Sequence, residues 1–145
     1  LSLGAYAYMN GQHNAAMLAF CFAAALLAFL RYNWYPAKVF PGDLNYTIGA
    51  VCACVAVIGN MEKFAILCFI PYAAEAMLKA LSGFEAESYG VLQPDGTVKP
   101  RGDRVRGLTH LVMKVGSFTE PQVALILMGV EALACLVAFM LAPII

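Results

Sequence analysis

The sequence predicts an all-α fold, a polytopic bundle of transmembrane helices in which polar loops connect hydrophobic segments. Of the 145 residues, 62% are hydrophobic and 12% are charged, whereas about a quarter of the residues of a soluble domain are charged. The hydrophobic residues gather in blocks that approach the roughly 20 residues of a membrane-spanning helix. The lipid bilayer is therefore an expected partner of the chain, and a nucleic acid is not.

Four blocks are predicted to form complete spans within a single membrane domain over residues 1–145. They cover residues 14–30, 44–58, 64–81 and 123–141. The first ends near tyrosine and tryptophan residues, which are frequent at membrane–water interfaces, and Pro71 is expected to kink the third. The apolar residues 1–8 are too few to cross a bilayer. We expect them to end a helix that begins before this chain, which would make the chain a C-terminal fragment.

Two polar loops separate these spans, a first loop over residues 31–43 and a second loop over residues 82–120. In the second loop, a Pro-Asp-Gly turn at residues 94–96 lies between short β-compatible runs and predicts a small hairpin. Residues 108–115 have apolar side chains spaced for one face of a short interfacial helix. Thr119 is expected to cap the last span through its hydroxyl, because an acid and a proline follow it in the first turn.

Basic residues predict which side of the membrane these loops face. Two spans separate the loops, so both loops lie on one side, and the loops with their edges hold eight of the nine lysines and arginines. The positive-inside rule therefore predicts that both loops, and any chemistry they carry, face the cytoplasm. The eight are Arg31, Lys38, Lys79, Lys99, Arg101, Arg104, Arg106 and Lys114, and Lys63 lies on the other side.

Asp43 is the sharpest candidate site residue, because it follows Pro-Gly and opens a predicted membrane helix. Its carboxylate can cap that helix and interact with the positive end of the helix dipole. Alternatively, it is a hard oxygen ligand for Mg²⁺, which proteins hold through one or two carboxylates together with substrate phosphates. The nearby Lys38 and the basic second loop favour an anionic substrate, and both readings stay open.

The second loop offers His110 and Arg104 as substrate-binding candidates. A histidine near basic residues is often an interfacial bystander, and the alternative is a donor that grips a phosphate or sugar oxygen. Arg104 and its basic neighbours supply the positive-inside signal, bind anionic lipid, or bind a substrate phosphate. Two acids inside predicted spans are also candidates. An ion pair with Lys79 accounts for Glu75, whereas Glu131 pairs with a helix outside this chain or lines a cavity.

Two motifs resemble a family of membrane transferases. The first loop reads Asn33-Trp34-Tyr35-Pro36-x-Lys38-Val39-Phe40-x-Gly42-Asp43. It is similar to a signature of the eukaryotic and archaeal UDP-N-acetylglucosamine:dolichyl-phosphate N-acetylglucosamine-1-phosphate transferases. The stretch from His110 to the Gly116-Ser117-Phe118-Thr119-Glu120-Pro121 element resembles the related bacterial phospho-N-acetylmuramoyl-pentapeptide transferase. The resemblance covers essentially the whole chain and matches the C-terminal part of the family's fold.

The resemblance implies a Mg²⁺-dependent transfer of a sugar-1-phosphate, expected to be N-acetylglucosamine-1-phosphate. The donor would be a UDP-sugar, the acceptor a polyprenyl or dolichyl phosphate, and UMP would be released. By position, Asp43 would be the catalytic carboxylate that meets Mg²⁺ and the pyrophosphate, and Phe40 would stack on the uracil ring. His110 would lie near the donor phosphates or sugar.

The chain also departs from the family pattern. Leu44 follows Asp43 where the family has a hydroxyl residue, and Gly49 comes six residues after the aspartate instead of seven. One missing residue turns a helix by about 100°. The Arg-His-Arg motif of the eukaryotic members falls near residues 84–86, and the acidic pair and the lysine that the family places earlier are absent. The isolated chain is therefore expected to be inactive without a missing N-terminal half.

A non-catalytic membrane component is the competing interpretation: a four-helix subunit or a transporter fragment, with Glu131 in a conduction path. A transporter is expected to distribute polar residues through several spans or to break its helices. Here polar residues concentrate at one face, which favours chemistry on a lipid headgroup. A truncated, inactive relative is a third interpretation, and whether two copies associate as a homodimer is left open.

Overall fold

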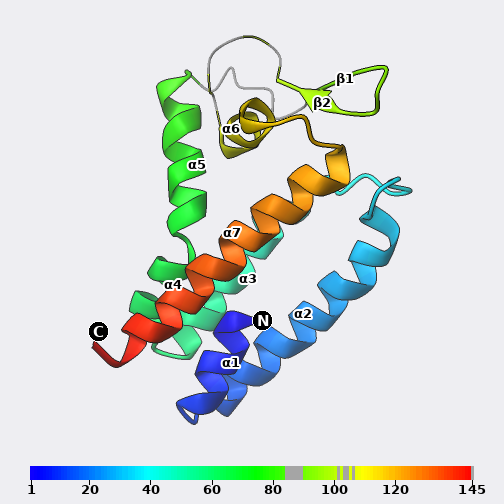
Figure 1. Cartoon of the computed structure of the whole chain (residues 1–145). Coiled ribbons are helices and arrows are strands. Elements are labelled where there is room, and N and C mark those ends of the chain that lie inside the picture. The colour runs from blue at the N-terminus through cyan, green and yellow to red at the C-terminus, as the bar shows by residue number, and fades with distance from the viewer. Residues whose placement is uncertain (84–89, 101, 103–104, 106, 145) are drawn as a thin grey trace. The chain divides into compact units, whose positions relative to one another are not determined.

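The computed structural model describes residues 1–83, 90–100, 102, 105 and 107–144. These residues form mainly helices, with a small two-stranded sheet (Figure 1). The chain divides into two compact units, each described by itself: a first unit of residues 1–67 and 137–145, and a second unit of residues 68–136. The elements are α1 (Ser2–Met9), α2 (His13–Asn33), α3 (Leu44–Ile58), α4 (Glu62–Cys68), α5 (Ile70–Leu81), β1 (Val91–Leu92), β2 (Val98–Lys99), α6 (Leu108–Val115), α7 (Glu120–Leu141) and the 3-10 helix η1 (Ala142–Ile144).

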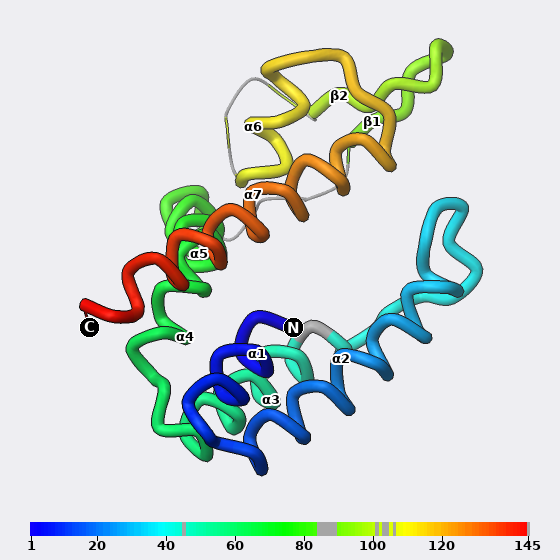
Figure 2. Tube along the Cα trace, turned by 60° about the horizontal axis from the view of Figure 1, so that its bottom comes forward, coloured from blue at the N-terminus to red at the C-terminus, as the bar shows by residue number. Residues whose placement is uncertain are grey.

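Small side chains bring α1 close to α2 in the first unit (Figure 2). Gly4 and Ala7 of α1 and Ala15 and Ala19 of α2 are buried. A Cβ atom on Gly4 would lie 3.0 Å from the ring of Phe20, so a larger residue at this position would require the ring to shift by a few tenths of an ångström. Membrane helices associate through such packing of small residues, because lipid tails provide no hydrophobic driving force between helices.

Aromatic rings join α1, α4 and the end of α7 in the first unit. The ring of Tyr6 stacks on that of Phe64 with a centroid distance of 4.0 Å. The ring of Phe139 meets Phe64 edge-on at 4.9 Å. Aromatic pairs in these arrangements stabilise a fold beyond the apolar area that they bury. The contacts explain why the last residues of the chain belong to the same unit as the first.

The predicted spans are confirmed in part. Among the described residues, α2 and α7 are the helices long and apolar enough to cross a membrane. The bounds of α3 are those predicted, but its 15 residues extend only about 22 Å, against a hydrocarbon core of about 30 Å. The third predicted span consists of α4 and α5, which count as one further span only if they are taken together. The structure thus supports two or three spans, and the count of four stays a prediction.

Helix ends in this region follow from proline and from capping. Pro71 is the second residue of α5, where it lacks an N–H group and its ring crowds the carbonyl four residues earlier. The helix breaks between Cys68 and Ile70 with a bend of 58°, which confirms the predicted kink. The last span begins at Glu120, close to the predicted start. The hydrogen bond that the structure gives at this helix start does not involve the Thr119 hydroxyl. The backbone N–H of Thr119 donates to Oε1 of Gln122 at 2.9 Å, which is one half of a capping box.

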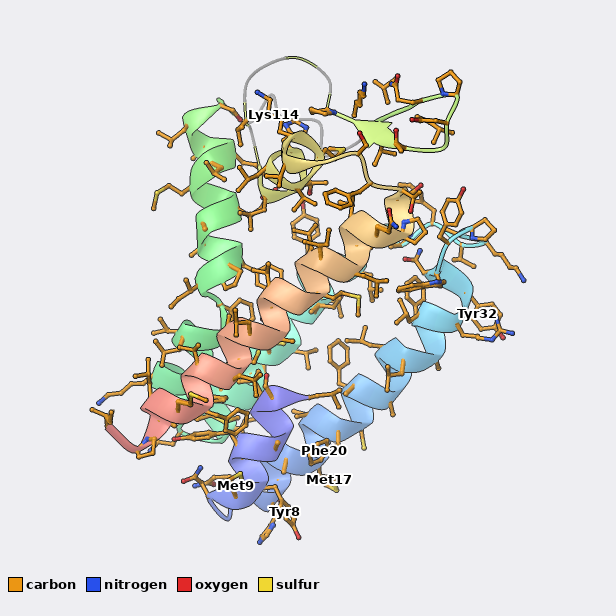
Figure 3. All side chains as sticks on the ribbon, viewed as in Figure 1. Tyr8, Met9, Met17, Phe20, Tyr32 and Lys114 are labelled. Atoms are coloured by element: carbon orange, nitrogen blue, oxygen red, sulfur yellow. The ribbon has the colours of Figure 1, made fainter. Side chains whose placement is uncertain are left out.

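Aromatic side chains mark both ends of α2 (Figure 3). Tyr8 lies just before the helix, with its ring 5.7 Å from that of His13 in an edge-on arrangement. Tyr32 lies in the last turn, and both tyrosines are exposed, as is Met17 between them. Tyrosine at the interface levels and exposed apolar residues between them are typical of a helix that faces lipid.

The predicted hairpin and short helix form the core of the second unit. In the antiparallel pair of β1 and β2, Leu92 lies opposite Val98. Val98 packs with Met113 of α6 and Val123 of α7 in a buried cluster. Its backbone N–H also donates to the carbonyl of Phe118 at 2.8 Å. The bounds of α6 are those predicted from the spacing of its apolar residues.

Candidate functional site

The first loop folds back on the last turn of α2. Nδ2 of Asn33 donates to the carbonyl of Val39 at 2.8 Å, and the backbone N–H of Lys38 donates to the carbonyl of Tyr32 at 2.9 Å. Gly42 then has a φ of 53°, a left-handed conformation that favours glycine. These local features close the loop and place the next residue, the predicted metal ligand, at the start of α3.

Asp43 is the N-cap residue of α3, but its side chain makes no capping hydrogen bond within the described part of the chain. Its backbone carbonyl accepts the N–H of Tyr46 at 3.1 Å, and the residue is exposed. Of the two readings offered by the sequence, a side-chain cap is therefore not what the structure shows. The negative charge lies at the positive end of the helix dipole, and the carboxylate oxygens are accessible to a cation.

Phe40 precedes Asp43 by three residues and is 81% exposed. A ring this exposed contributes nothing to a core, so a flat ligand could stack on its face. Lys38, two residues earlier, is exposed as well. The structure thus brings an aromatic ring, an ammonium group and a carboxylate together on one short exposed segment. The ring can stack on a nucleobase and the ammonium group attracts an anion, whereas the carboxylate favours an anionic ligand only if a cation lies between them.

His110 lies on α6 in the second unit and is only 2% exposed. The sequence placed it in an interfacial position, so its burial differs from that expectation. The reason is the packing of α6, whose other buried residue, Met113, belongs to the cluster with Val98. Arg104, the second substrate-binding candidate of this loop, lies outside the described residues.

Glu75 connects α5 to α6 within the second unit. Its Oε1 lies 3.1 Å from Nζ of Lys79, which confirms the predicted ion pair. Its Oε2 also accepts the backbone N–H of Leu108, the first residue of α6. The sequence did not predict this second bond, because 33 residues separate the two partners. A signal was nevertheless present, since Gly107 precedes α6 and has no side chain with which to cap it.

Glu131 lies in α7 and has Cys135 as a neighbour one turn away. The thiol of Cys135 lies 3.7 Å from Oε1 of Glu131. The other carboxylate oxygen, Oε2, is buried and has no hydrogen-bond partner among the residues that the structure describes. These contacts do not test whether Glu131 pairs with a helix outside this chain or lines a conducting cavity. Both interpretations stay predictions.

The described residues contain no group of three or more histidine, cysteine, aspartate or glutamate side chains that could hold a metal ion. A hollow of about 290 Å³ in the first unit is lined in part by Tyr6, Asn60 and Lys63. Asn60 follows the C-terminus of α3, whereas Asp43 precedes its N-terminus. The hollow therefore lies at the opposite end of α3 from the first loop, and none of the predicted site residues lines it.

Comparison with known proteins points to a class of membrane transferase. Residues 1–60 match the model of glycosyl transferase family 4, and this segment contains the first loop with Phe40 and Asp43. The chain is 36% identical, over 97% of its length, to a candidate UDP-N-acetylglucosamine–dolichyl-phosphate N-acetylglucosaminephosphotransferase of Saccharolobus solfataricus, of which it covers 45%. It is 34% identical, over 86% of its length, to a protein of the same name in Sulfolobus acidocaldarius, of which it covers 38%.

A bacterial relative extends the comparison. The chain is 29% identical, over 92% of its length, to the phospho-N-acetylmuramoyl-pentapeptide-transferase of Clostridium novyi, of which it covers 38%. The resemblance inferred from the first loop and from the stretch after His110 is therefore confirmed. The chain spans less than half the length of these curated relatives. No solved structure matches it.

Proposed function

We propose that this chain is part of a membrane glycosyltransferase that moves a sugar-1-phosphate from a UDP-sugar to a polyprenyl or dolichyl phosphate. The sugar is expected to be N-acetylglucosamine, as in the names of the archaeal relatives, and UMP leaves. The observation that carries the proposal is the first loop. Its exposed Asp43 carboxylate is not used as a cap, its Phe40 ring is exposed, and both lie in the segment that matches the family model.

The charges of the substrates explain why a carboxylate is useful at this position. Both substrates carry phosphate groups, and a lone carboxylate would repel them. Magnesium typically binds one or two carboxylates together with substrate phosphates and several waters. The donor set in this chain fits such a shared site, since Asp43 is exposed and its carboxylate makes no capping hydrogen bond within the described residues. When bound, the ion would neutralise charge that develops on the leaving phosphate oxygen.

The remaining residues of the first loop would bind and orient the donor. Phe40 would hold the uracil ring by stacking, and Lys38 would attract the diphosphate. The attacking lipid phosphate is already anionic, so orientation matters more for it than activation. His110 is proposed to act near the donor phosphates or sugar, and Arg104 to bind a substrate phosphate. The positive-inside rule predicts a cytoplasmic face for this chemistry if both α3 and the α4–α5 pair cross the membrane between the two basic loops.

Release of UMP by the complete, purified protein tests the proposal. We expect release to require UDP-N-acetylglucosamine, dolichyl phosphate and Mg²⁺ together, and omission of the lipid serves as the control for simple hydrolysis. Absence of UMP under all donor and acceptor pairs would refute the proposal. Ion or solute movement through protein-containing vesicles, without UMP, would favour the transporter fragment instead.

The 145-residue chain alone provides a second test. It spans less than half of the relatives' length, and it lacks the acidic pair and the lysine that the family places earlier. We therefore expect the isolated chain to release no UMP above the background without enzyme. Turnover by the isolated chain would show that all catalytic groups are contained in it, and the assignment of a partial site would be wrong.

A further inference from the structure

The N-terminus of α6 depends on a side chain from another helix. Helix α6 begins after Gly107, which has extended backbone angles (φ −179°, ψ 168°) and no side-chain cap. The first N–H groups of a helix lack partners within the helix. Here the carboxylate of Glu75 accepts the first of them, from Leu108. A carboxylate at this position is favourable twice, as an acceptor of a charge-assisted hydrogen bond and as a negative charge at the positive end of the helix dipole.

The carboxylate of Glu75 also forms an ion pair. Lys79, one turn later on α5, lies 3.1 Å from Oε1, and the Glu75 side chain is 23% exposed. Gly107 provides the space: a Cβ atom at this position would lie 2.8 Å from Oε1 and 3.0 Å from Oε2 of Glu75. Glycine is therefore needed here for the close approach of the carboxylate, although its φ does not demand it.

The other half of α6 is fixed by packing. Met113 is buried with Val98 of the hairpin and Val123 of α7, and a Cβ atom on Gly90 would lie 2.7 Å from its sulfur. His110 lies in the first turn of α6, next to the end that Glu75 holds and three residues before Met113. The first turn is the part of a short helix that frays most readily when its cap is removed.

We propose that Glu75 is a positioning residue, whose carboxylate closes the N-terminus of α6 and so fixes the turn that carries His110. This inference rests on the proposed function, in which His110 acts near the donor phosphates or sugar. Glu75 touches no reacting atom in this account. It acts through the backbone of Leu108, and Gly107 leaves room for its carboxylate.

Four variants of the complete protein separate the hydrogen bond from the charge. Glu75→Ala removes both, whereas Glu75→Gln keeps an oxygen that accepts the Leu108 N–H. Gly107→Ala keeps every charge but pushes the carboxylate away from the helix end. Lys79→Met is the matched control, because it breaks the ion pair and leaves the acceptor in place. Hydrogen exchange of residues 108–111 is measured beside the KM of each substrate.

We expect Glu75→Ala and Gly107→Ala to lose exchange protection in the first turn of α6 and to raise the KM for the UDP-sugar about tenfold. The KM for the polyprenyl phosphate should stay unchanged. For Glu75→Gln and Lys79→Met, the KM for the UDP-sugar and the KM for the polyprenyl phosphate should both stay within about threefold of the wild-type values. A merely structural role would lower the amount of folded protein and leave the KM of the folded fraction unchanged.

Distinct results would overturn the inference. Retained protection in Glu75→Ala would show that Glu75 does not hold α6, and lost protection with an unchanged KM would show that α6 does not position the donor site. Equal losses in Glu75→Gln and Glu75→Ala would assign the effect to charge and not to the hydrogen bond. If the wild-type protein releases no UMP, the proposed function fails, and the exchange data still decide whether Glu75 fixes α6.

Discussion

The first loop and α6 both carry predicted site residues, but they differ in how far these residues are exposed and in which contacts hold the segment. Phe40 and Asp43 are exposed, and the loop that bears them is closed by two hydrogen bonds to backbone carbonyls. His110 is buried, on a short helix held by a distant carboxylate at one end and by a hydrophobic cluster at the other. A residue of the first kind can change ligand binding without affecting the fold, whereas one of the second kind affects both.

Asp43→Asn should give the largest effect of this comparison. The substitution keeps the size of the side chain and removes the charge that would meet a cation. We expect UMP release by the complete protein to fall at least about a hundredfold, in line with the loss of one strong electrostatic contact in a transition state. Stability should fall by no more than about 1 kcal/mol, the usual size of a charge–dipole interaction at a helix end, because Asp43 makes no capping bond within the described residues.

Two results would contradict this account of the first loop. Wild-type rates in Asp43→Asn would remove the assigned catalytic role. A loss of stability well above about 1 kcal/mol, together with a lowered rate, would show that the first loop is as tightly coupled to the fold as α6. Asn33→Ala, which removes the bond to the Val39 carbonyl, serves as the control for loss of loop geometry without loss of charge.

Phe40→Ala should give the next largest effect. Stacking of a base on an aromatic ring contributes about 1–3 kcal/mol by alanine substitution, so the KM for the UDP-sugar should rise about tenfold or more. Stability should not change, because the ring is 81% exposed. Phe40→Trp is the matched variant, and it should restore the KM. An unchanged KM in Phe40→Ala would contradict stacking on uracil.

Asp95 in the hairpin turn should give the smallest effect, and only at low pH. The hydroxyl and the backbone N–H of Thr97 donate to its carboxylate at 2.7 and 3.1 Å, and these bonds lower the pKa of Asp95 below its usual value. A lowered pKa in the folded state means that the carboxylate stabilises the turn fully above its unfolded pKa of about 3.9. That contribution is lost as the pH falls through the folded pKa.

Amide exchange of Thr97 at a series of pH values measures this effect. Protection of the turn should be constant near neutral pH and should weaken only below about pH 4. Asp95→Asn should change UMP release at neutral pH by less than about twofold, because the residue is exposed and an amide oxygen still accepts. A larger change would mean that the hairpin is coupled to the proposed donor site.

The sequence predicted the elements with clear flanking signals and missed those set by distant contacts. The bounds of α3 and α6 follow from the glycines beside them and from the spacing of their apolar residues. The number of spans does not follow in the same way, because 15 apolar residues in α3 and a broken pair at Phe69 satisfy a hydrophobicity pattern without giving full-length helices.

The candidate site shows the same division. Phe40 and Asp43 could be selected from a local motif, and the structure shows both exposed, so that a ligand can reach them. The burial of His110 and the bond from Leu108 to Glu75 depend on residues far away in the sequence. No local pattern around His110 encodes them. The Gly107 start of α6, a helix without a cap of its own, was the nearest thing to a sequence signal.

The shortness of α3 bears on how a long isoprenoid could meet a water-soluble nucleotide. A rod of about 22 Å cannot reach from one headgroup layer to the other across about 30 Å of hydrocarbon. If α3 crosses the membrane, the bilayer around it thins, or its Asp43 end lies beneath the plane of the surrounding headgroups. In either geometry the proposed site lies in a depression of the membrane surface. A polyprenyl phosphate could then reach the proposed site while its isoprenoid chain stays in the hydrocarbon core of the bilayer.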